Sequence, residues 1–172
     1  MISRLFAVTT CALTLFALPA AAQVENWTPV TDAVLQDPPA EDWLNWRRTL
    51  DAQAHSPLDE INRDNVGDLR LVWSWALRTG PQQTTPLVRD GVLFVANPGE
   101  IVHALDAVTG DLIWEYERGA EAPGNSFGGP PPGRMTRNIA MWDDKIYLNT
   151  ADAHIVAIDA RTGEEVWDTD IN

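Results

Sequence analysis

The sequence has almost no cysteine, and its one thiol lies in a segment that we expect to be removed. Cys11 is the only cysteine among 172 residues. It falls within an N-terminal stretch ordered like an export signal, with basic Arg4, an apolar run over 5–18 and three alanines at 20–22. We therefore expect cleavage between Ala22 and Gln23. The mature chain would then hold no disulfide, no cysteine-ligated metal and no cysteine-attached haem.

A second long apolar run is also missing. A membrane-spanning helix needs about 20 apolar residues to cross about 30 Å of hydrocarbon, and the run over 5–18 is shorter than that. The sequence therefore predicts no transmembrane segment in the mature chain. Together with the export signal, it predicts a periplasmic protein.

Basic residues are scarce as well. The sequence has 12 Lys and Arg against 25 Asp and Glu, a formal net charge of −13, and removal of 1–22 would take away Arg4 and no acid. A surface of this sign repels phosphate backbones, so we expect no nucleic-acid partner. A solvated acidic surface explains the charge, although a basic partner protein is electrostatically permitted.

What the sequence does contain is an internal repeat that ends on tryptophan. The stretch A-L-D-A-V-T-G-D-L-I-W at 104–114 returns as A-I-D-A-R-T-G-E-E-V-W at 157–167, an offset of 53 residues (157 − 104). A period of this length is typical of stacked blades or coils. In each copy the aspartate can bond turn amides, the glycine tolerates positive φ, and the tryptophan can lie flat on the neighbouring blade. We interpret Asp106, Gly110, Trp114 and their counterparts Asp159, Gly163 and Trp167 as structural residues.

The pattern around the repeat is one of strands and turns. Leu69, Leu71, Trp73 and Trp75 alternate as in a strand with one buried face. Two sets of four strands follow, predicted at 84–88, 91–96, 101–105 and 112–116, and at 138–142, 145–149, 154–158 and 165–168. Four strands per repeat indicate a propeller blade. We predict an all-β, incomplete β-propeller of about two four-stranded blades over 71–172, preceded by a signal at 1–22 and an N-terminal arm over 23–70. In that arm Asn62 is expected to begin a short helical turn over 63–65.

The long Gly- and Pro-rich segment at 119–134 permits two interpretations. It is either a surface loop without regular structure or a loop folded over the central opening of the propeller, where binding sites concentrate. Arg134 and Arg137 follow it and favour the second interpretation.

Several stretches together resemble the pyrroloquinoline quinone (PQQ)-dependent alcohol dehydrogenases, which are exported bacterial quinoproteins. They are W-L-N-W at 43–46, H-S-P-L-D-E-I-N-R-D-N-V-G-D-L at 55–69, L-V-W-S-W at 71–75, T-P-L-V-R-D-G-V-L-F-V at 85–95, and both tryptophan repeats. The S-P-L-x-x-I-N-x-x-N-V-x-x-L string is specific to that family, whereas the tryptophan repeat is shared with cofactor-free propellers.

The resemblance implies an eight-bladed propeller that holds PQQ near its axis with a calcium or lanthanide ion. In that family an aspartate accepts the proton of an alcohol substrate, hydride passes to the quinone, and electrons leave singly to a cytochrome. On this basis we expect the N-terminal part of a periplasmic alcohol dehydrogenase. The metal ligands and the catalytic aspartate of the family would lie beyond Asn172, so no catalytic or metal-binding residue is assigned here.

Two positions match the cofactor-binding residues of the family. Gln83 stands where the family has a glutamate, and Arg137 matches an arginine whose guanidinium could bind a PQQ carboxylate or quinone oxygen. Many soluble members carry adjacent cysteines shortly before this arginine, and here 131–133 is Pro-Pro-Gly. His55, His103 and His154 show no metal-ligand spacing and are interpreted as packing residues.

Two other interpretations stay open at this stage. The first is a cofactor-free propeller scaffold of the exported assembly-factor type, favoured by Gln83 and by the proline run, and disfavoured by the S-P-L-D-E-I-N string. The second is a truncated gene product, whose exposed blade edges would invite association. Under all of these interpretations, including the dehydrogenase, we expect no turnover of an alcohol by this chain alone.

Overall fold

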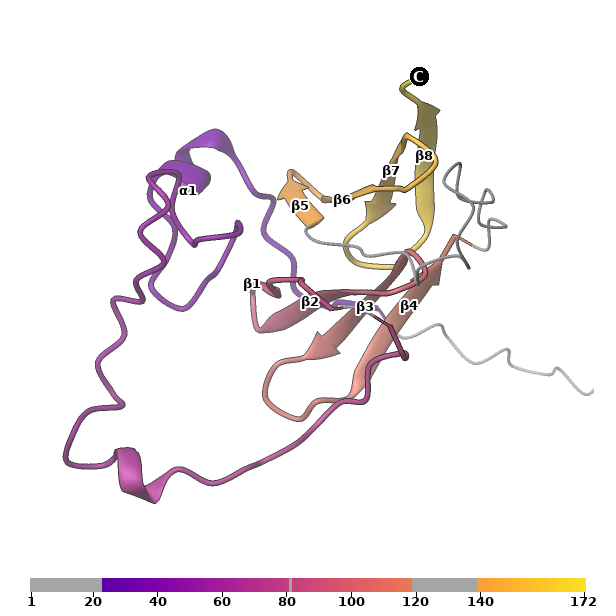
Figure 1. Cartoon of the computed structure of the whole chain (residues 1–172). Coiled ribbons are helices and arrows are strands. Elements are labelled where there is room, and N and C mark those ends of the chain that lie inside the picture. The colour runs from indigo at the N-terminus through magenta and orange to yellow at the C-terminus, as the bar shows by residue number, and fades with distance from the viewer. Residues whose placement is uncertain (1–22, 81, 119–138) are drawn as a thin grey trace, which may run out of the picture.

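The computed structural model describes residues 23–80, 82–118 and 139–172, and its framework is two four-stranded antiparallel sheets (Figure 1). Each sheet runs in sequence order, β1-β2-β3-β4 in the first and β5-β6-β7-β8 in the second. We call them blade 1 and blade 2. This arrangement confirms the predicted all-β, incomplete propeller. The strands are β1 Leu87–Arg89, β2 Val92–Asn97, β3 Ile101–Asp106, β4 Leu112–Glu117, β5 Ile139–Trp142, β6 Lys145–Asn149, β7 His154–Asp159 and β8 Glu165–Asp170.

The repeated aspartate organises the turn between the third and fourth strands of each blade. The Oδ1 atom of Asp106 accepts hydrogen bonds from the backbone N–H groups of Val108 and Thr109, both at 2.8 Å. Asp159 does the same for the two equivalent residues of blade 2, both at 2.9 Å. Gly110 and Gly163 end these turns at φ values of 78° and 76°. The predicted structural role of all four residues is therefore confirmed.

Trp114 joins the two blades. Its indole N–H donates to the carbonyl oxygen of Ala160 at 3.0 Å, and only 6% of the residue is exposed. A Cβ atom built on Gly163 would lie 2.7 Å from the Trp114 ring, so the ring lies directly against the glycine. Glycine is required at position 163 for two reasons. The tryptophan ring leaves no room for a side chain, and the backbone has positive φ. Trp167, at the same position of blade 2, is 39% exposed.

The N-terminal arm packs across both blades. Val30 pairs with Asp143 in blade 2, and Trp43 pairs with Val88 of β1. The arm also contributes Val24, Val30 and Leu44 to the common apolar core. A short helix, α1 (Asp32–Gln36), begins where the Thr31 hydroxyl accepts a hydrogen bond from the Val34 N–H at 3.3 Å. The sequence interpretation as an extended arm missed this helix.

A buried ion pair fastens the arm to blade 1. The Arg89 guanidinium donates to the Asp42 carboxylate, and the two side chains are 4% and 3% exposed. Arg89 also donates through Nε to the carbonyl oxygen of Thr28 at 3.1 Å. Removing Arg89 would leave the Asp42 carboxylate buried without its ion-pair partner, which is costly. The arm is therefore held by charge as well as by apolar contacts.

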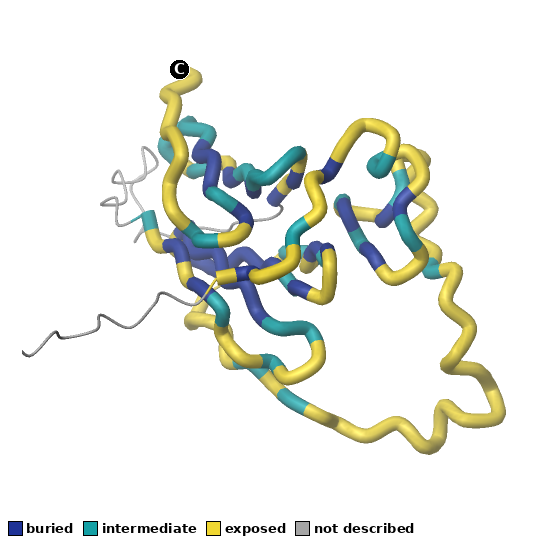
Figure 2. The backbone as a smooth tube through the Cα atoms, turned by 180° about the vertical axis from the view of Figure 1, so that it is seen from behind, coloured by how far each residue is buried: buried dark blue, intermediate teal, exposed yellow. Residues whose placement is uncertain are grey.

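Residues 51–72, which form the end of the arm and the start of the connection to blade 1, lead away from both sheets and are almost entirely exposed (Figures 1 and 2). They contain the 3-10 helix η1 (Val66–Asp68) and, just before it, a turn in which Asn62 Oδ1 accepts from the Asp64 N–H at 3.0 Å. The predicted helical turn at 63–65 is thus followed directly by η1. The strand predicted from the alternation of Leu69 to Trp75 is absent, because this stretch has no neighbouring strand among the described residues. Within these described ranges no helix is long and apolar enough to cross a membrane.

Two glycines with the same backbone conformation allow the tryptophan contact to be tested. Gly91 and Gly163 both have φ of +76°, but a Cβ on Gly91 meets nothing within 4 Å. We expect Gly91→Ala to cost about 1–2 kcal/mol through φ strain alone. Gly163→Ala should cost about 1–3 kcal/mol more, because the methyl group displaces Trp114. Urea unfolding followed by tryptophan fluorescence measures both, and equal destabilisation by the two substitutions would contradict the docking contact.

Candidate functional site

The candidate site lies at the end of the blades formed by the β2–β3 and β6–β7 hairpin turns, which we call the loop end. The strand register places the residues before β1 at this end. Arg89 pairs with Val92 at the start of β2, and Leu87 pairs with Phe94 farther along β2. The residues before Leu87 therefore continue toward the end of β2 that leads into the β2–β3 turn. The Arg78 N–H donates to Asn97 Oδ1 at 3.3 Å, and a Cβ on Gly80 would lie 2.7 Å from Pro98. The segment that leads into β1 is thereby attached to the β2–β3 turn.

Three buried polar atoms at this end have no hydrogen-bond partner within the described ranges. They are the side-chain oxygen and nitrogen of Gln82 and the hydroxyl oxygen of Thr84. Gln83, which the sequence singles out as a cofactor contact, lies between them and is exposed. An unsatisfied buried polar group costs about 1–3 kcal/mol. Gln82 and Thr84 are therefore groups for which a ligand or a further part of the protein would supply the missing partner.

Arg118 forms the charged centre of the loop end. It follows β4, and its Nη1 atom donates to both carboxylate oxygens of Asp152 at 2.7 and 2.6 Å. Its Nε and Nη2 atoms donate to Asp168 Oδ2 at 3.1 and 2.9 Å. Glu100 lies 3.6 Å from Nη1 and accepts a hydrogen bond from the Ala151 N–H at 2.7 Å. We call this group the Arg118 clasp, since it joins the last strand of blade 1 to the β6–β7 turn and to β8 of blade 2.

The clasp shifts the titration of its members. Hydrogen bonds to Asp152 and Asp168 raise the pKa of Arg118 further above its already high value, against an opposing effect of burial. Hydrogen bonds from Arg118 lower the pKa of Asp152 far below its usual range. Burial acts to raise the pKa of Asp168, but hydrogen bonds from His154 and Arg118 outweigh it and the pKa falls. Arg118, Asp152 and Asp168 are therefore charged at neutral pH.

The clasp is not arranged to bind a cation. Its carboxylates converge on a guanidinium, which occupies the centre where a metal ion would have to sit. No cluster of three or more His, Cys, Asp or Glu side chains suited to a metal ion occurs within 23–80, 82–118 or 139–172. His103 is buried between Glu115, Asn97 and Trp75, and His154 bonds Asp168. Both histidines are thus engaged by neighbouring side chains.

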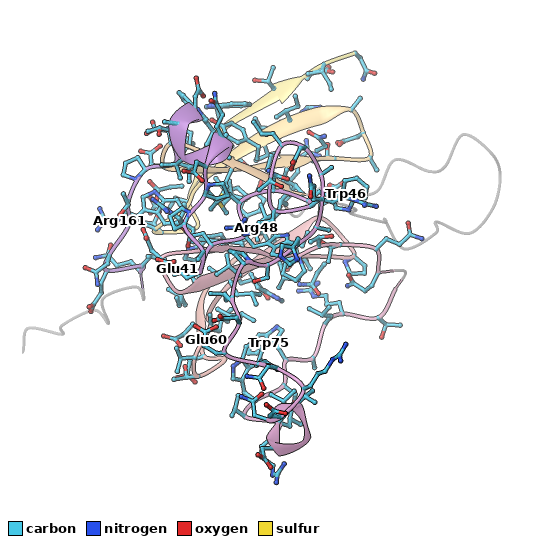
Figure 3. The ribbon with its side chains drawn as sticks, turned by 90° about the vertical axis from the view of Figure 1, so that its left-hand side faces the viewer. Glu41, Trp46, Arg48, Glu60, Trp75 and Arg161 are labelled. Atoms are coloured by element: carbon cyan, nitrogen blue, oxygen red, sulfur yellow. The ribbon has the colours of Figure 1, made fainter. Side chains whose placement is uncertain are left out.

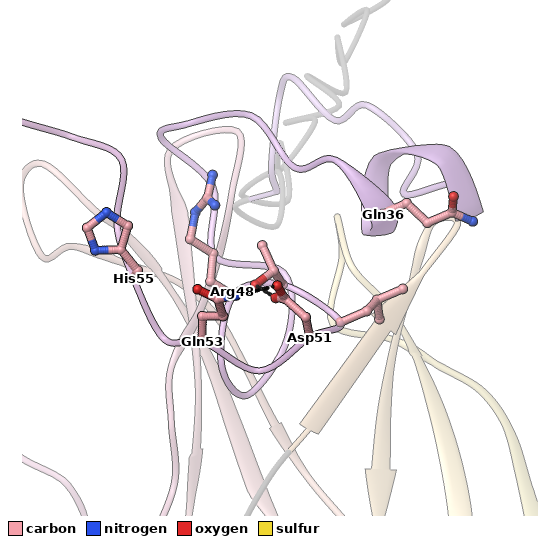
Figure 4. Close-up of a pocket in the computed structure, with 7 residues that line it drawn as sticks. Gln36, Arg48, Asp51, Gln53 and His55 are labelled. Atoms are coloured by element: carbon pink, nitrogen blue, oxygen red, sulfur yellow. Dashed lines mark hydrogen bonds between the residues drawn. The ribbon is translucent and has the colours of Figure 1, made fainter.

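Two surface pockets are lined by residues other than Gln82, Gln83, Thr84 and Arg118. One, of about 430 Å³, is lined by arm residues that include Arg48, Asp51 and His55 (Figure 4). Arg48 is 8% exposed and donates through Nη2 to the carbonyl oxygens of Pro38 and Pro39, both at 3.1 Å. Figure 3 shows Arg48 and Trp46 in the same arm. The second, of about 680 Å³, lies beside the Asp90–Gly91 turn, at the opposite end of blade 1.

Of the predicted site residues, the structure describes Gln83. Gln83 lies at the loop end, while Arg137, Arg134 and the segment 119–134 fall outside the described residues, as do the signal at 1–22 and Cys11. Sequence reasoning missed Gln82, Thr84 and the Arg118 clasp. The signal for the clasp was weak, because a charged residue after a strand usually indicates only a solvated end. Neither Gln82 nor Thr84 has any local pattern that predicts burial.

Comparison with known proteins identifies the fold and its relatives. Residues 43–166 match the family model described as the glucose/ethanol/alcohol dehydrogenase β-propeller domain. The chain is 39% identical over 170 residues to the dehydrogenase subunit of a quinone alcohol dehydrogenase from Acetobacter aceti. This match covers 97% of this chain and 22% of that protein.

Solved structures give the same result. The quinohemoprotein alcohol dehydrogenase ADHIIG of Pseudomonas putida HK5 matches with a TM-score of 0.72 and 33% identity, over 84% of this chain and 21% of that one. A europium-containing methanol dehydrogenase matches with a TM-score of 0.67 and 27% identity, over 80% of this chain and 24% of that one. The chain thus spans about a fifth of the length of the relatives that it matches.

The charge state of Asp152 predicts how the clasp responds to pH. Its pKa is lowered on folding, so its stabilising contribution is present above the unfolded pKa near 3.9 and is lost as pH falls toward the folded value. We expect Asp152→Asn to lower the free energy of unfolding by about 1–3 kcal/mol at pH 7, and by progressively less below about pH 4. Glu164→Gln, at an exposed carboxylate without an ion pair in the described chain, is the matched control. If the difference in the free energy of unfolding between Asp152→Asn and the parent protein did not change with pH, the clasp would be contradicted.

Proposed function

This chain belongs to the glucose/ethanol/alcohol dehydrogenase β-propeller family, and we propose that it forms the N-terminal part of a periplasmic quinoprotein that oxidises an alcohol with PQQ. The observation that carries the proposal is the continuous match, which runs from the arm through both blades. The S-P-L-D-E-I-N string in the arm supports it independently, because cofactor-free propellers share only the tryptophan repeat. The activity belongs to the whole protein, of which these blades form one side.

The loop end is where this chain would contact PQQ. The Gln82 amide and the Thr84 hydroxyl offer buried donors and acceptors without partners, which suits the carboxylate and carbonyl oxygens of a quinone cofactor. Gln83, and Arg137 on the far side of the 119–134 segment, are the residues proposed from the family pattern. When bound, PQQ supplies a quinone that accepts a hydride equivalent from the alcohol carbon.

The remaining residues of the loop end would position these groups. The Arg118 clasp fixes the end of β4, from which the chain continues toward Arg137. The hydrogen bond from Arg78 to Asn97 fixes the segment that leads to Gln82. The clasp and the Arg78–Asn97 hydrogen bond both lie in described parts of the chain, and they position segments of the protein rather than the cofactor itself. They would keep the donors in place before the cofactor binds, which lowers the entropy cost of binding.

The metal, the base and the electron acceptor belong to the proposal as well. A calcium or lanthanide ion is proposed with ligands beyond Asn172, in keeping with the europium-containing relative. The catalytic aspartate is proposed to lie there too. Electrons would leave to a cytochrome, consistent with the haem implied by the name of the quinohemoprotein relative. Export by the signal at 1–22 would place the protein in the periplasm.

One observation favours a second candidate, a cofactor-free propeller scaffold. Gln83 carries no charge where the family has a glutamate, and its side chain is exposed. In that case Gln82 and Thr84 would be satisfied by other parts of the protein, and PQQ would not bind. Cofactor binding therefore separates the two candidates directly.

The complete gene product tests the proposal. Supplied with PQQ and calcium, it should bind PQQ, seen as quenching of tryptophan fluorescence, and should oxidise primary alcohols with an artificial dye acceptor. A lanthanide should be tried in place of calcium. The purified fragment 23–172 should show no turnover under the same conditions. Lack of PQQ binding with either metal would exclude the quinoprotein and leave the scaffold.

Two adjacent glutamines test which side chain meets the cofactor. Gln82→Leu should weaken PQQ binding by the complete protein about tenfold, since about 1.4 kcal/mol is lost with one good hydrogen bond. It should also raise the stability of the cofactor-free protein, because two unsatisfied buried groups disappear. Gln83→Leu should weaken binding without changing that stability, since Gln83 is exposed. If Gln82→Leu destabilised the cofactor-free protein or left PQQ affinity unchanged, the assignment of Gln82 would be wrong.

A further inference from the structure

Arg48 is buried in the N-terminal arm without an acidic partner among the described residues. It is 8% exposed, and its side chain donates through Nη2 to the carbonyl oxygens of Pro38 and Pro39. Its Nε atom is buried and has no hydrogen-bond partner within the described ranges. Arg89, which is buried to a similar degree, is paired with the Asp42 carboxylate. Because a guanidinium keeps its charge and buried charges are ordinarily paired, Arg48 calls for an anion that the described chain does not supply.

Arg48 also lines a pocket of about 430 Å³ that a small solute can enter from solvent (Figure 4). The pocket lies between the last residue of α1 and the turn over 48–55. Thr49 is half-buried, and the rest of the lining is exposed, namely Gln36, Leu50, Asp51, Gln53 and His55. A buried positive charge therefore lines a cavity that is open to solvent.

Asp51, the acidic residue of the pocket wall, is bonded to its own neighbours. The Thr49 hydroxyl donates to Asp51 Oδ1 at 2.5 Å, and the Gln53 amide donates to Oδ2 at 2.9 Å. Figure 4 shows the Arg48 guanidinium pointing away from this group. No ion pair joins Arg48 to Asp51 or to another carboxylate in the described parts of the chain. The acid in the wall thus leaves the charge of Arg48 uncompensated.

The turn that carries Arg48 is already formed without a ligand. Arg48, Ala52 and Ala54 have φ values of 68°, 59° and 54°, a left-handed conformation that is uncommon outside glycine. The Ala52 N–H donates to the Thr49 carbonyl at 2.9 Å, and the Ala54 N–H donates to the Arg47 carbonyl at 3.1 Å. Residues in such conformations cluster at ligand sites, because the surrounding structure has to fix them there.

We propose that the Arg48 pocket binds a small free monocarboxylate, whose oxygens accept hydrogen bonds from the Arg48 guanidinium. Nη1 donates to no described residue, so this nitrogen is available to a ligand. A planar carboxylate matches the plane of the guanidinium and supplies the negative charge that Arg48 lacks. The proposed function makes no use of this pocket, and the inference stands apart from it.

The walls of the pocket limit which anion fits. Asp51 places a negative charge beside the site, which opposes a dianion more strongly than a monoanion. Leu50 is 64% exposed and offers an apolar surface to a short hydrocarbon chain. We therefore expect short aliphatic monocarboxylates to bind, and to stabilise the folded arm by mass action.

Saturation-transfer NMR on the complete gene product without PQQ tests the site, with sodium acetate as the probe. The acetate methyl signal should receive saturation from the protein, with a Kd in about the millimolar range expected for a ligand of so few atoms. Acetamide, the neutral isostere, should receive none, and chloride or sulfate at the same ionic strength should not displace acetate. No transfer to acetate, equal transfer to acetamide, or displacement by sulfate would overturn the proposal. Because no cofactor is present, failure of PQQ binding leaves this result unaffected.

Two adjacent arginines provide a matched pair of variants. Arg47 is exposed and lies over the Trp46 ring at 4.4 Å, outside the pocket lining, whereas Arg48 is buried and lines the pocket. Arg48→Met should weaken acetate binding at least about tenfold, because the charge that holds the carboxylate is removed. Arg47→Met should change it by less than about twofold. Equal weakening by the two substitutions, or unchanged binding in Arg48→Met, would contradict the site.

Gln36 keeps the test decisive if Arg48→Met disturbs the arm through its bonds to Pro38 and Pro39. Gln36 is exposed, lines the pocket and makes no side-chain hydrogen bond to a described residue, so both of its charged variants should fold. Gln36→Lys should tighten acetate binding about threefold and Gln36→Glu should weaken it about threefold, since a charge in the wall acts on the bound anion. Acetate affinity that is the same in both variants would place the bound acetate elsewhere and overturn the proposal.

Discussion

The fold depends on the contact between a tryptophan ring and a glycine-bearing turn of the next blade. A four-stranded blade has two apolar faces and is not stable until both are covered, so its outer strand has to carry a large side chain to its neighbour. Trp114 does this for blade 1 against Gly163, and its indole N–H is satisfied by the Ala160 carbonyl at the same place. The contact combines buried area, a hydrogen bond and a backbone conformation that glycine adopts readily. Position and angle between successive blades follow from it.

The other parts of the structure supplement this contact at the two ends of the blades. At one end the N-terminal arm crosses both sheets and is fastened by the buried pair of Arg89 and Asp42. At the loop end the Arg118 clasp joins β4 to blade 2. The same end holds the unsatisfied atoms of Gln82 and Thr84. A rigid frame beside unpaired polar groups is what a binding site requires before its ligand arrives.

The sequence predicts the framework well, because the framework is made of local signals that repeat. Asp106, Gly110 and Trp114 each have a backbone or packing reason visible in a short motif, and Asp159 and Gly163 repeat the turn in the second copy. The alternation around Trp73 predicts a strand that is absent from the described chain, because a strand needs a partner and pairing is not a local property. The Arg118 clasp and the burial of Gln82 arise from residues that meet only after folding. The predicted cofactor contacts at Gln83 and Arg137 come from family resemblance, and no contact in the described chain tests them.

The central claim is that these blades are the start of a closed PQQ-binding ring held together by docked tryptophans. A crystal structure of the complete gene product with PQQ tests it most directly. The account predicts that Trp167 lies against a glycine turn of the next blade and that the cofactor contacts Gln82. A structure in which Trp167 remains exposed and the cofactor makes no contact with Gln82 would contradict it.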